Sequence, residues 1–270
     1  MKPAPFDYHA AASPADAVAL LRGDGGLAKV CGGSQSLAPM LNLRLAQVDR
    51  LVDVSRLDAL RGFTLTDDTL RIGAAVTHAR IEDGELPDVT RGLLPTVAAG
   101  IAYRAVRNRG TLGGSLAHAD PAADWVSTMR LLDATLLLLG GTGERSVGAR
   151  DFFVGPFTTV LADDEIIVGV EVPCFSPQAR WAYRKTCRKP GEFADAIAAV
   201  WVDPAAGIAR ALIGAQGGMP HVVDGLAAVR ALQQPAAMSR ALDDAGLDDD
   251  YAREVHATML RRALREIFPA

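Results

Sequence analysis

Two glycine pairs, each flanked by hydroxyl side chains, constrain the fold of this 270-residue chain more than any other feature of its sequence. The first pair lies in CGGSQS (31–36) and the second in TLGGS (111–115), and each leads towards a segment with helical spacing. Glycine lets the main chain approach an anion closely, and free N–H groups at a helix start supply hydrogen-bond donors. Because a dinucleotide has a single diphosphate, two such loops converging on it would form a binding site. A glycine pair before a helix is more often a plain tight turn, so that alternative stays open for each loop alone.

The common nucleotide-binding fingerprints are absent from both loops. Neither GxGxxG nor GxxxxGK[ST] occurs there, so we expect neither a nicotinamide-binding Rossmann unit nor a P-loop. Asp120 and Asp124 follow the second loop, where they could accept hydrogen bonds from ribose hydroxyls, adenine or a flavin. Helix capping beside Pro121 is the alternative role for each aspartate, and it is the favoured one for Asp120.

Charge and cysteine content exclude several classes of function. The net charge is −4, which gives no electrostatic footprint for nucleic acid. The three cysteines (31, 174 and 187) form no CxxC or Cys/His cluster, so we expect no metal site in this chain, and an iron–sulfur cluster would belong to a partner. The N-terminal region lacks a signal-peptide core and no run of about 18 apolar residues follows, so we expect a cytoplasmic protein without an integral membrane segment.

Local patterns predict a mixed α+β chain. Ser13 and Pro14 are typical of a helix start, and the pattern of strand, helix and strand over 27–31, 35–45 and 50–54 predicts a small βαβ-type lobe. Further strands are expected at 70–74, 135–139 and 165–172, and helices after Thr77 and over 93–101 and 121–132. The segment 175–177 is the best candidate for a linker between domains. Beyond it we expect strands at 181–185, 196–202 and 208–214, and then helices over 225–268.

Four stretches in order carry a resemblance to a known family: CGGSQSLAPMLNLRLA (31–46), TLGGSLAHADPAADW (111–125), LADDEIIVGVEVP (161–173) and AYRKTCRKPGEFADAIAAV (182–200). They resemble the FAD-binding medium subunits of molybdenum hydroxylases, of the carbon monoxide dehydrogenase and xanthine dehydrogenase type. The resemblance implies an α+β protein with a two-lobed FAD-binding fold of the vanillyl-alcohol oxidase (PCMH) type over 1–175. Its lobes would be about 1–55 and 56–175, and a small C-terminal α+β domain of the carbon monoxide dehydrogenase flavoprotein type would occupy 176–270.

The resemblance also implies which residues bind FAD. Those lining the diphosphate would be Lys29, Val30, Cys31, Gly32, Gly33, Ser34, Gln35 and Ser36. The facing wall would be Ile101, Thr111, Gly113, Gly114, Ser115 and His118. Asp124 would contact FAD, Leu161 would do so through its backbone, and Lys185 would lie close to the flavin ring.

Two of these residues have competing explanations. A cation such as Lys185 near the carbonyl edge of the flavin would stabilise the anionic reduced ring and raise its potential, whereas the neighbouring basic residues alone favour a surface lysine. His118 beside Asp120 resembles a metal ligand, but with five histidines and no HxxxH pairing, a hydrogen bond to backbone or diphosphate is favoured. No catalytic side chain and no metal ligand is predicted.

The implied function is electron transfer within a larger enzyme. A large subunit would oxidise substrate at molybdenum, a small subunit would carry two [2Fe-2S] clusters, and FAD on this chain would pass the electrons to an acceptor, in a dimer of heterotrimers. One alternative is a self-sufficient FAD-dependent oxidase or dehydrogenase of the same fold, for which residues 176–270 are too short a substrate domain. Another is a scaffold that has lost flavin, which the intact glycine and hydroxyl positions oppose.

Overall fold

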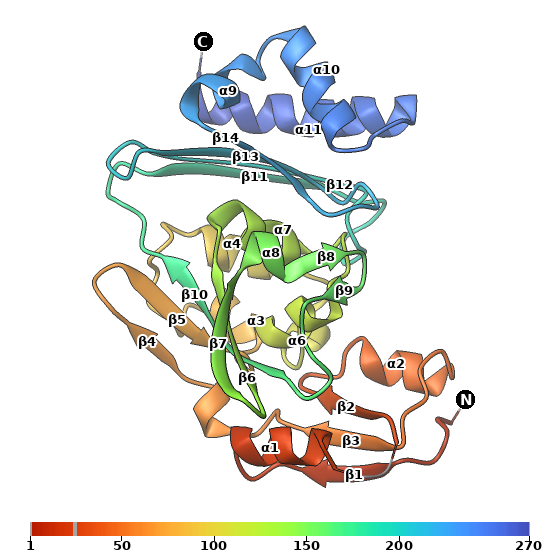
Figure 1. Cartoon of the computed structure of the whole chain (residues 1–270). Coiled ribbons are helices and arrows are strands. Elements are labelled where there is room, and N and C mark those ends of the chain that lie inside the picture. Colours follow the sequence, from red (N-terminus) through yellow and green to blue (C-terminus); the bar gives the residue numbers. More distant parts are fainter. Residues whose placement is uncertain (1, 24–25, 270) are drawn as a thin grey trace.

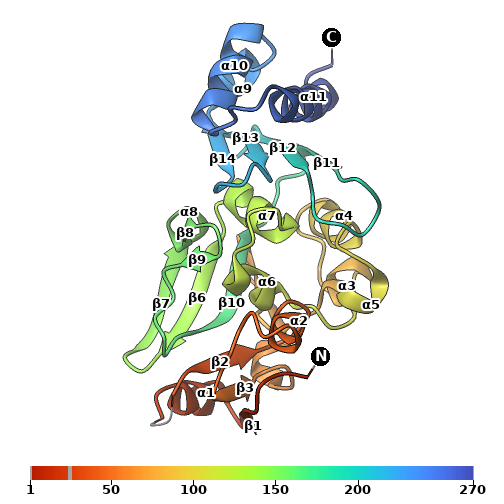
Figure 2. The same ribbon diagram turned by 90° about the vertical axis from the view of Figure 1, so that its right-hand side faces the viewer.

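The computed structural model describes residues 2–23 and 26–269. Its described strands form sheets of three, five, four and two strands (Figure 1). Figures 1 and 2 show the three-stranded sheet at one end of the molecule, the five-stranded sheet and its helices in the middle, and the four-stranded sheet with three helices at the other end. The mixed α+β class expected from the sequence is confirmed.

The three-stranded sheet is parallel and has the order β1-β3-β2. Ser13 caps α1, with its hydroxyl accepting from the Asp16 N–H at 3.0 Å, and Pro14 is the first helical residue, as expected. The helix expected over 35–45 is shorter, because Arg44 adopts a positive φ of 57° directly after the helix ends. The elements are β1 (Asp7–Ala10), α1 (Pro14–Leu21), β2 (Ala28–Cys31), α2 (Leu37–Asn42) and β3 (Arg50–Asp53).

The five-stranded sheet is antiparallel and has the order β4-β5-β10-β6-β7. It consists of β4 (Phe63–Leu65), β5 (Thr69–Gly73), β6 (Thr135–Gly140), β7 (Gly143–Gly148) and β10 (Ile166–Pro173). The connecting elements are η1 (Asp58–Leu60), α3 (His78–Glu82), α4 (Leu93–Ala99), α5 (Arg104–Arg107), α6 (Leu112–His118), α7 (Asp124–Leu132), α8 (Ala149–Phe152), β8 (Phe153–Gly155) and β9 (Thr158–Thr159).

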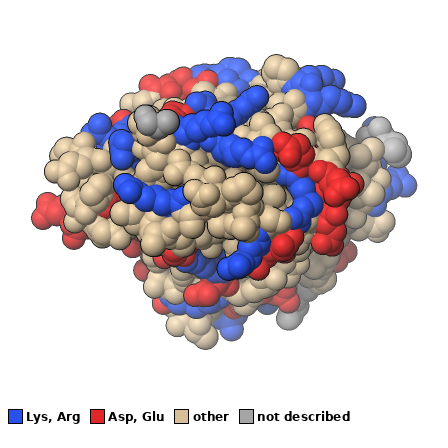
Figure 3. Space-filling view, turned by 90° about the horizontal axis from the view of Figure 1, so that it is seen from above, with Lys and Arg blue, Asp and Glu red and all other residues tan. Residues whose placement is uncertain are grey.

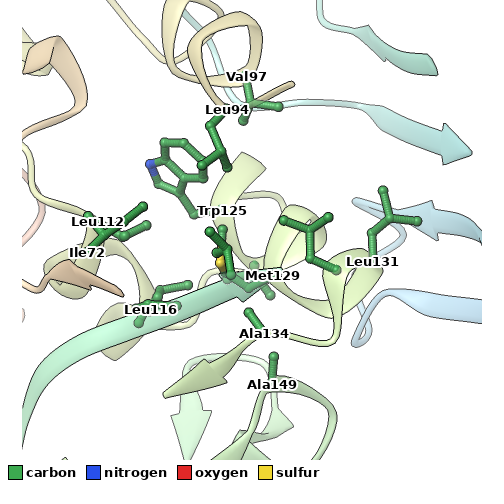
Figure 4. Packing of buried hydrophobic residues seen from close by; sticks show 14 of the residues in the cluster. Ile72, Leu94, Val97, Leu112, Leu116, Trp125, Met129, Leu131, Ala134 and Ala149 are labelled. Carbon is green, nitrogen blue, oxygen red and sulfur yellow. The ribbon is translucent and has the colours of Figure 1, made fainter. Parts of the chain in front are cut away.

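The main core lies around α7. Trp125 and Met129 are fully buried and pack with Leu112, Leu116 and Ile72 from the neighbouring elements (Figure 4). The helix expected over 121–132 begins at Asp124, three residues later, because Pro121 and Ala122 form a turn in which Asp120 accepts from the Ala122 N–H. Asp120 therefore stabilises the turn before the helix and does not cap α7 as expected, because the N-cap residue is Ala123.

The C-terminal sheet is an antiparallel meander that is covered on both faces. Every residue of β12 is buried, and the alternation of the strand sends Ile197 and Trp201 towards α7 and Ala198 and Val200 towards the C-terminal helices. The elements are β11 (Arg180–Thr186), β12 (Ala196–Asp203), β13 (Ile208–Gly214), β14 (His221–Asp224), α9 (Leu226–Ala231), α10 (Pro235–Asp244) and α11 (Asp250–Ile267).

The segment 175–177 is anchored to this sheet. The Phe175 ring stacks on Trp201 with centroids 4.6 Å apart, and the Ser176 hydroxyl donates to Asp203 at 2.6 Å. The expected linker is thus a packed connection. Within the described ranges, no helix combines the length and the apolar character needed to cross a membrane.

Candidate functional site

The two glycine loops predicted from the sequence lie in direct contact. A Cβ added to Gly33 would overlap the carbonyl group of Arg109 and lie 2.7 Å from the Gly110 Cα, and one added to Gly32 would lie 3.0 Å from the Thr111 Oγ1. Any side chain at position 33 would therefore force the backbones apart. The glycines are needed because the first loop packs on the main chain that leads into the second.

The first loop presents free backbone donors. The N–H groups of residues 32–36 donate to no acceptor in the described part of the chain. Ser34 has a positive φ of 57°, and the carbonyls of Ser34 and Ser36 accept the first hydrogen bonds of the α2 turns at 3.1 and 3.2 Å. This combination of open N–H groups and a tight turn fits a bound anion such as a diphosphate.

The second loop differs from the first, contrary to the expectation of two equivalent loops. Gly113 and Gly114 lie inside the first turn of α6, and their N–H groups donate to the Ala74 carbonyl at 2.9 Å and to the Thr111 Oγ1 at 3.1 Å. A Cβ on Gly113 would lie 2.5 Å from the Ala74 Cβ. This pair thus packs α6 against residues 74–78, while Gly114 stays exposed and Ser115 half-exposed.

His78 packs against Gly110, next to the contact between the two glycine loops, and nothing in the sequence pointed to it. Its backbone N–H donates to the Gly110 carbonyl at 2.9 Å, and a Cβ on Gly110 would lie 2.8 Å from its ring. The Trp125 indole N–H donates to His78 Nδ1 at 3.0 Å. Burial, aided by the positive charge of Arg107, lowers the pKa of His78 to about 4, so the ring is a neutral acceptor at pH 7.

Asp124 and Lys185 form a buried ion pair between α7 and β11. The Lys185 Nζ lies 2.7 Å from Asp124 Oδ2 and donates to the Gly100 carbonyl at 3.1 Å, and the side chains are only 13% and 6% exposed. The Tyr183 hydroxyl donates to Asp124 Oδ1 at 2.7 Å. Lys185 is therefore not a surface lysine.

The environment of this pair shifts two pKa values. Burial raises the pKa of Asp124, and Lys185 and Tyr183 oppose that rise. Burial and the carboxylate of Asp124 raise the pKa of Tyr183 well above its usual value, so the phenol remains a donor. Tyr183 was missed in the sequence, because only the fold brings residues 183 and 124 together.

Ile101 lies in a loop that Arg107 holds in place. The Arg107 Nη1 donates to the carbonyls of Ile101 and Ala102 at 2.9 and 3.0 Å, and its other nitrogens bind Glu82. Ala102 has a positive φ of 42°, which these hydrogen bonds stabilise. The wall predicted at Ile101 is thus a braced turn that precedes the second loop.

The remaining predicted residues occupy the edges of this region. Lys29 is exposed and Val30 half-buried in β2, and burial raises the pKa of the Cys31 thiol to about 11, so the thiol is neutral. The His118 ring at the end of α6 packs near Phe157, with centroids 5.3 Å apart, and the Leu161 N–H donates to Thr159. The side chain of Gln35 bonds its own loop at the Gly33 carbonyl.

Residues 4–175 match the family model for the FAD binding domain in molybdopterin dehydrogenase. The chain belongs to this family. Its FAD cofactor and the resemblance inferred from sequence are therefore confirmed.

The similarity to two relatives covers nearly the whole chain. It is 34% identical to the carbon monoxide dehydrogenase medium chain of Hydrogenophaga pseudoflava, over 98% of this chain and 97% of that one. It is also 34% identical to the nicotine 6-hydroxylase medium subunit of Paenarthrobacter nicotinovorans, over 96% of this chain and 92% of the other.

Solved structures share the fold of this family member. A carbon monoxide dehydrogenase from Hydrogenophaga pseudoflava has a TM-score of 0.87 and 35% identity, with 98% of each chain covered. The quinoline 2-oxidoreductase from Pseudomonas putida 86 has a TM-score of 0.83 and 33% identity, covering 100% of this chain and 98% of that one. The match therefore includes β11 to α11, beyond the FAD-binding family model.

Proposed function

We propose that this chain is the FAD-binding electron-transfer subunit of a molybdenum hydroxylase, and that it passes electrons from iron–sulfur clusters of a partner to an external acceptor. The observation that carries the proposal is the contact between residues 32–33 and 109–111, beside which the N–H groups of 32–36 are open. FAD would supply the redox chemistry when bound. The protein's own residues bind and orient it.

The diphosphate is assigned to the first loop. Its N–H groups would donate to the phosphate oxygens, and the hydroxyls of Thr111, which lies beside Gly32, and of Ser115 would add further donors. Because the N–H groups of Gly113 and Gly114 are already used, the second loop acts mainly through side-chain hydroxyls and close packing. The proposed contacts are the residues expected from the resemblance: Lys29, Val30, Cys31, Gly32, Gly33, Ser34, Gln35, Ser36, Ile101, Thr111, Gly113, Gly114, Ser115, His118, Asp124, Leu161 and Lys185.

Lys185 is proposed to place a positive charge near the flavin ring. The Asp124 carboxylate and the Gly100 carbonyl fix its ammonium, and Tyr183 fixes the carboxylate in turn. A fixed cation next to a redox cofactor favours the more negative state of that cofactor and so raises its potential. In this proposal no side chain of the chain acts as acid, base or nucleophile.

The wider assembly follows the family. We propose a cytoplasmic dimer of heterotrimers, with a large subunit that binds the molybdenum cofactor and a small subunit with two [2Fe-2S] clusters. Residues 1–175 would form the FAD-binding domain, with lobes of about 1–55 and 56–175, and residues 176–270 the C-terminal domain. The names of the relatives, as medium chains and medium subunits, support a role inside a larger enzyme.

The test begins with the chain expressed alone. We expect a flavin absorption spectrum, about one FAD per chain released by heat or acid, and turnover of reducing substrate only after the partner subunits are added. Turnover by the chain alone would favour the self-sufficient oxidase or dehydrogenase. Absence of flavin both from the isolated chain with excess FAD and from the assembled enzyme would contradict the proposal.

A further inference from the structure

A groove lined by α9, the C-terminal part of α11 and the start of β11 carries four arginines. It has a volume of about 590 Å³, and the arginines come from three elements: Arg180 begins β11, Arg230 lies in α9, and Arg261 and Arg265 lie in α11. Most of the other lining residues are apolar: Leu264, Ile267, Phe268 and Pro269. Figure 3, which views this end of the molecule from above, shows lysine and arginine side chains interspersed with acidic ones on a largely uncharged face.

Three of these arginines have no acidic partner. Among the described residues, Arg180, Arg230 and Arg265 form no ion pair, and Arg261 pairs only with the exposed Glu254, at 3.0 Å. The Arg230 guanidinium lies over the Phe268 ring, 5.2 Å from its centroid, which fixes one charge at the groove wall. In a chain with a net charge of −4, the groove is a local excess of positive charge.

The helix dipole accounts for only part of this arrangement of arginines. Arg230 and Arg265 lie in the last turns of their own helices, where the helix dipole favours a cation. Arg180 lies in a strand, and the dipole gives no reason for three unpaired guanidinium groups to converge on one groove. Like charges held together repel one another, and an anion in the groove would remove that cost.

A second groove extends the first, so the combined binding surface is longer than one small anion. This groove has a volume of about 340 Å³ and adjoins the first, because Gln233 and Arg261 line both. Its other lining combines apolar side chains, such as Leu232, Met238 and Ala257, with the charged Arg253, Asp250 and Glu254, so the basic end continues into a mixed stretch between α10 and α11. Arginine beside an apolar core is typical of protein interfaces.

We infer that these two grooves bind an acidic polypeptide segment of a partner subunit, with carboxylates at the arginine end and an apolar side chain beyond it. Guanidinium groups bind carboxylates in pairs of parallel hydrogen bonds, so the arginine end selects acidic residues. The inference rests on the proposed function, since it places the partner in the same enzyme. It adds a docking surface remote from the loop contact at 32–36 and 109–111.

The first experiment measures assembly of the FAD-loaded chain with its molybdenum and iron–sulfur partner subunits. Arg230→Glu/Arg265→Glu should weaken association by at least about tenfold, and the deficit should shrink as salt is raised. Arg240→Glu on α10 is the matched control: Arg240 is exposed, lines neither groove, and should change association by less than about twofold. Flavin content should be the same in all three proteins.

A second experiment locates the partner. Arg265→Lys keeps the charge and places an amine in the groove, which a carbodiimide joins to a nearby carboxylate in the assembled enzyme. We expect a cross-link from position 265 to an Asp or Glu of one partner subunit, and none from Arg240→Lys.

Two outcomes overturn the inference, and they are distinguishable from failure of the proposed function. If the unaltered chain assembles but charge reversal has no effect and position 265 does not cross-link, the docking surface is wrong while the proposed function stands. If charge reversal spares assembly but abolishes binding of inorganic pyrophosphate, the groove is a small-anion site. If the unaltered chain does not assemble with either partner, the proposed function fails and the inference with it.

Discussion

The ammonium of Lys185 lies 2.7 Å from the carboxylate of Asp124, and this ion pair joins the C-terminal sheet to the helix at the centre of the main core. Both side chains are largely buried, so each charge depends on the other. The two residues stand 61 positions apart in sequence, so only the folded chain brings the two charges together.

Replacing Lys185 by methionine should destabilise the protein. The change leaves the Asp124 carboxylate buried with only Tyr183 as a partner, and such a loss costs about 3 to 5 kcal/mol of the free energy of unfolding. Chemical denaturation at neutral pH measures it. The double variant Asp124→Asn/Lys185→Met should recover much of the loss, because no uncompensated charge remains.

The same variant should show a characteristic pH dependence. Burial already raises the pKa of Asp124, and Lys185 opposes that rise, so removing the lysine raises the pKa further. A raised carboxyl pKa in the folded state means that stability is highest below the unfolded pKa and falls as pH rises through the folded one. The deficit of Lys185→Met should therefore shrink from neutral pH towards about pH 4. A deficit independent of pH would point to lost packing instead.

The two glycine loops could be predicted from sequence, and their different uses could not. Residue types at 31–36 and 111–115 indicate close approach of backbone to an anion. Whether an N–H group is open depends on what packs against it. In the second loop the N–H groups of Gly113 and Gly114 already donate to the Ala74 carbonyl and to Thr111. Ala74 lies 39 residues before Gly113 in the sequence.

Other features lay beyond sequence reasoning for the same reason. The strand β12 was predictable from its continuous apolar run, and the start of α1 from Ser13 and Pro14. The short strand β1 is mostly exposed and has no alternating pattern to reveal it. The hydrogen bonds of His78 with Trp125 and of Tyr183 with Asp124 span 47 and 59 residues, so only the topology brings these partners together.

Substituting Gly33 by alanine should remove FAD from the chain. The new methyl group would collide with the Arg109 carbonyl and push the open N–H groups of 32–36 away from their present positions. We expect FAD affinity to fall by more than about tenfold, equivalent to about 1.4 kcal/mol or more. Titration of the flavin-free chain with FAD measures the change.

Gly218→Ala is the matched control for that variant. No atom of the described residues lies within 4 Å of a Cβ at this position, so FAD affinity and melting temperature should both be unchanged. If Gly33→Ala binds FAD normally and melts like the control, the loop contact does not position the donors. If both variants lose flavin, the effect is not specific to the loop.

The neutral imidazole of His78 should make stability fall in mild acid. Its folded pKa of about 4 lies below the usual histidine pKa of about 6.5, so the unfolded chain binds the proton more readily. Stability from this group is fully present above the unfolded pKa and is lost as pH falls through that value towards the folded one. By linkage the loss approaches about 3 kcal/mol at pH 4.

His78→Asn isolates this contribution. The asparagine Oδ1 occupies a position close to that of Nδ1, so the Trp125 indole keeps an acceptor, while the side chain does not titrate. Denaturation curves measured at a series of pH values between neutral and about pH 4 should show a shallower fall for the variant than for the unaltered chain. If stability falls equally with pH in the variant and in the unaltered chain, His78 binds its proton equally well in the folded and unfolded states.

Arg107 should matter more than its neighbour Arg104, although both are arginines that contact Glu82. Arg107 is 12% exposed and holds the carbonyls of Ile101 and Ala102, whereas Arg104 is 47% exposed and, among the described residues, bonds only side chains. Lysine cannot reproduce the several donors of a guanidinium, so Arg107→Lys should cost about 1 to 3 kcal/mol of stability and Arg104→Lys less than about 1 kcal/mol. If the braced turn at Ile101 forms the proposed wall of the FAD site, Arg107→Lys should also lower FAD affinity severalfold, whereas Arg104→Lys should not. Equal effects of the two variants on both stability and FAD affinity would show that the charge around Glu82 matters and that the carbonyl contacts do not.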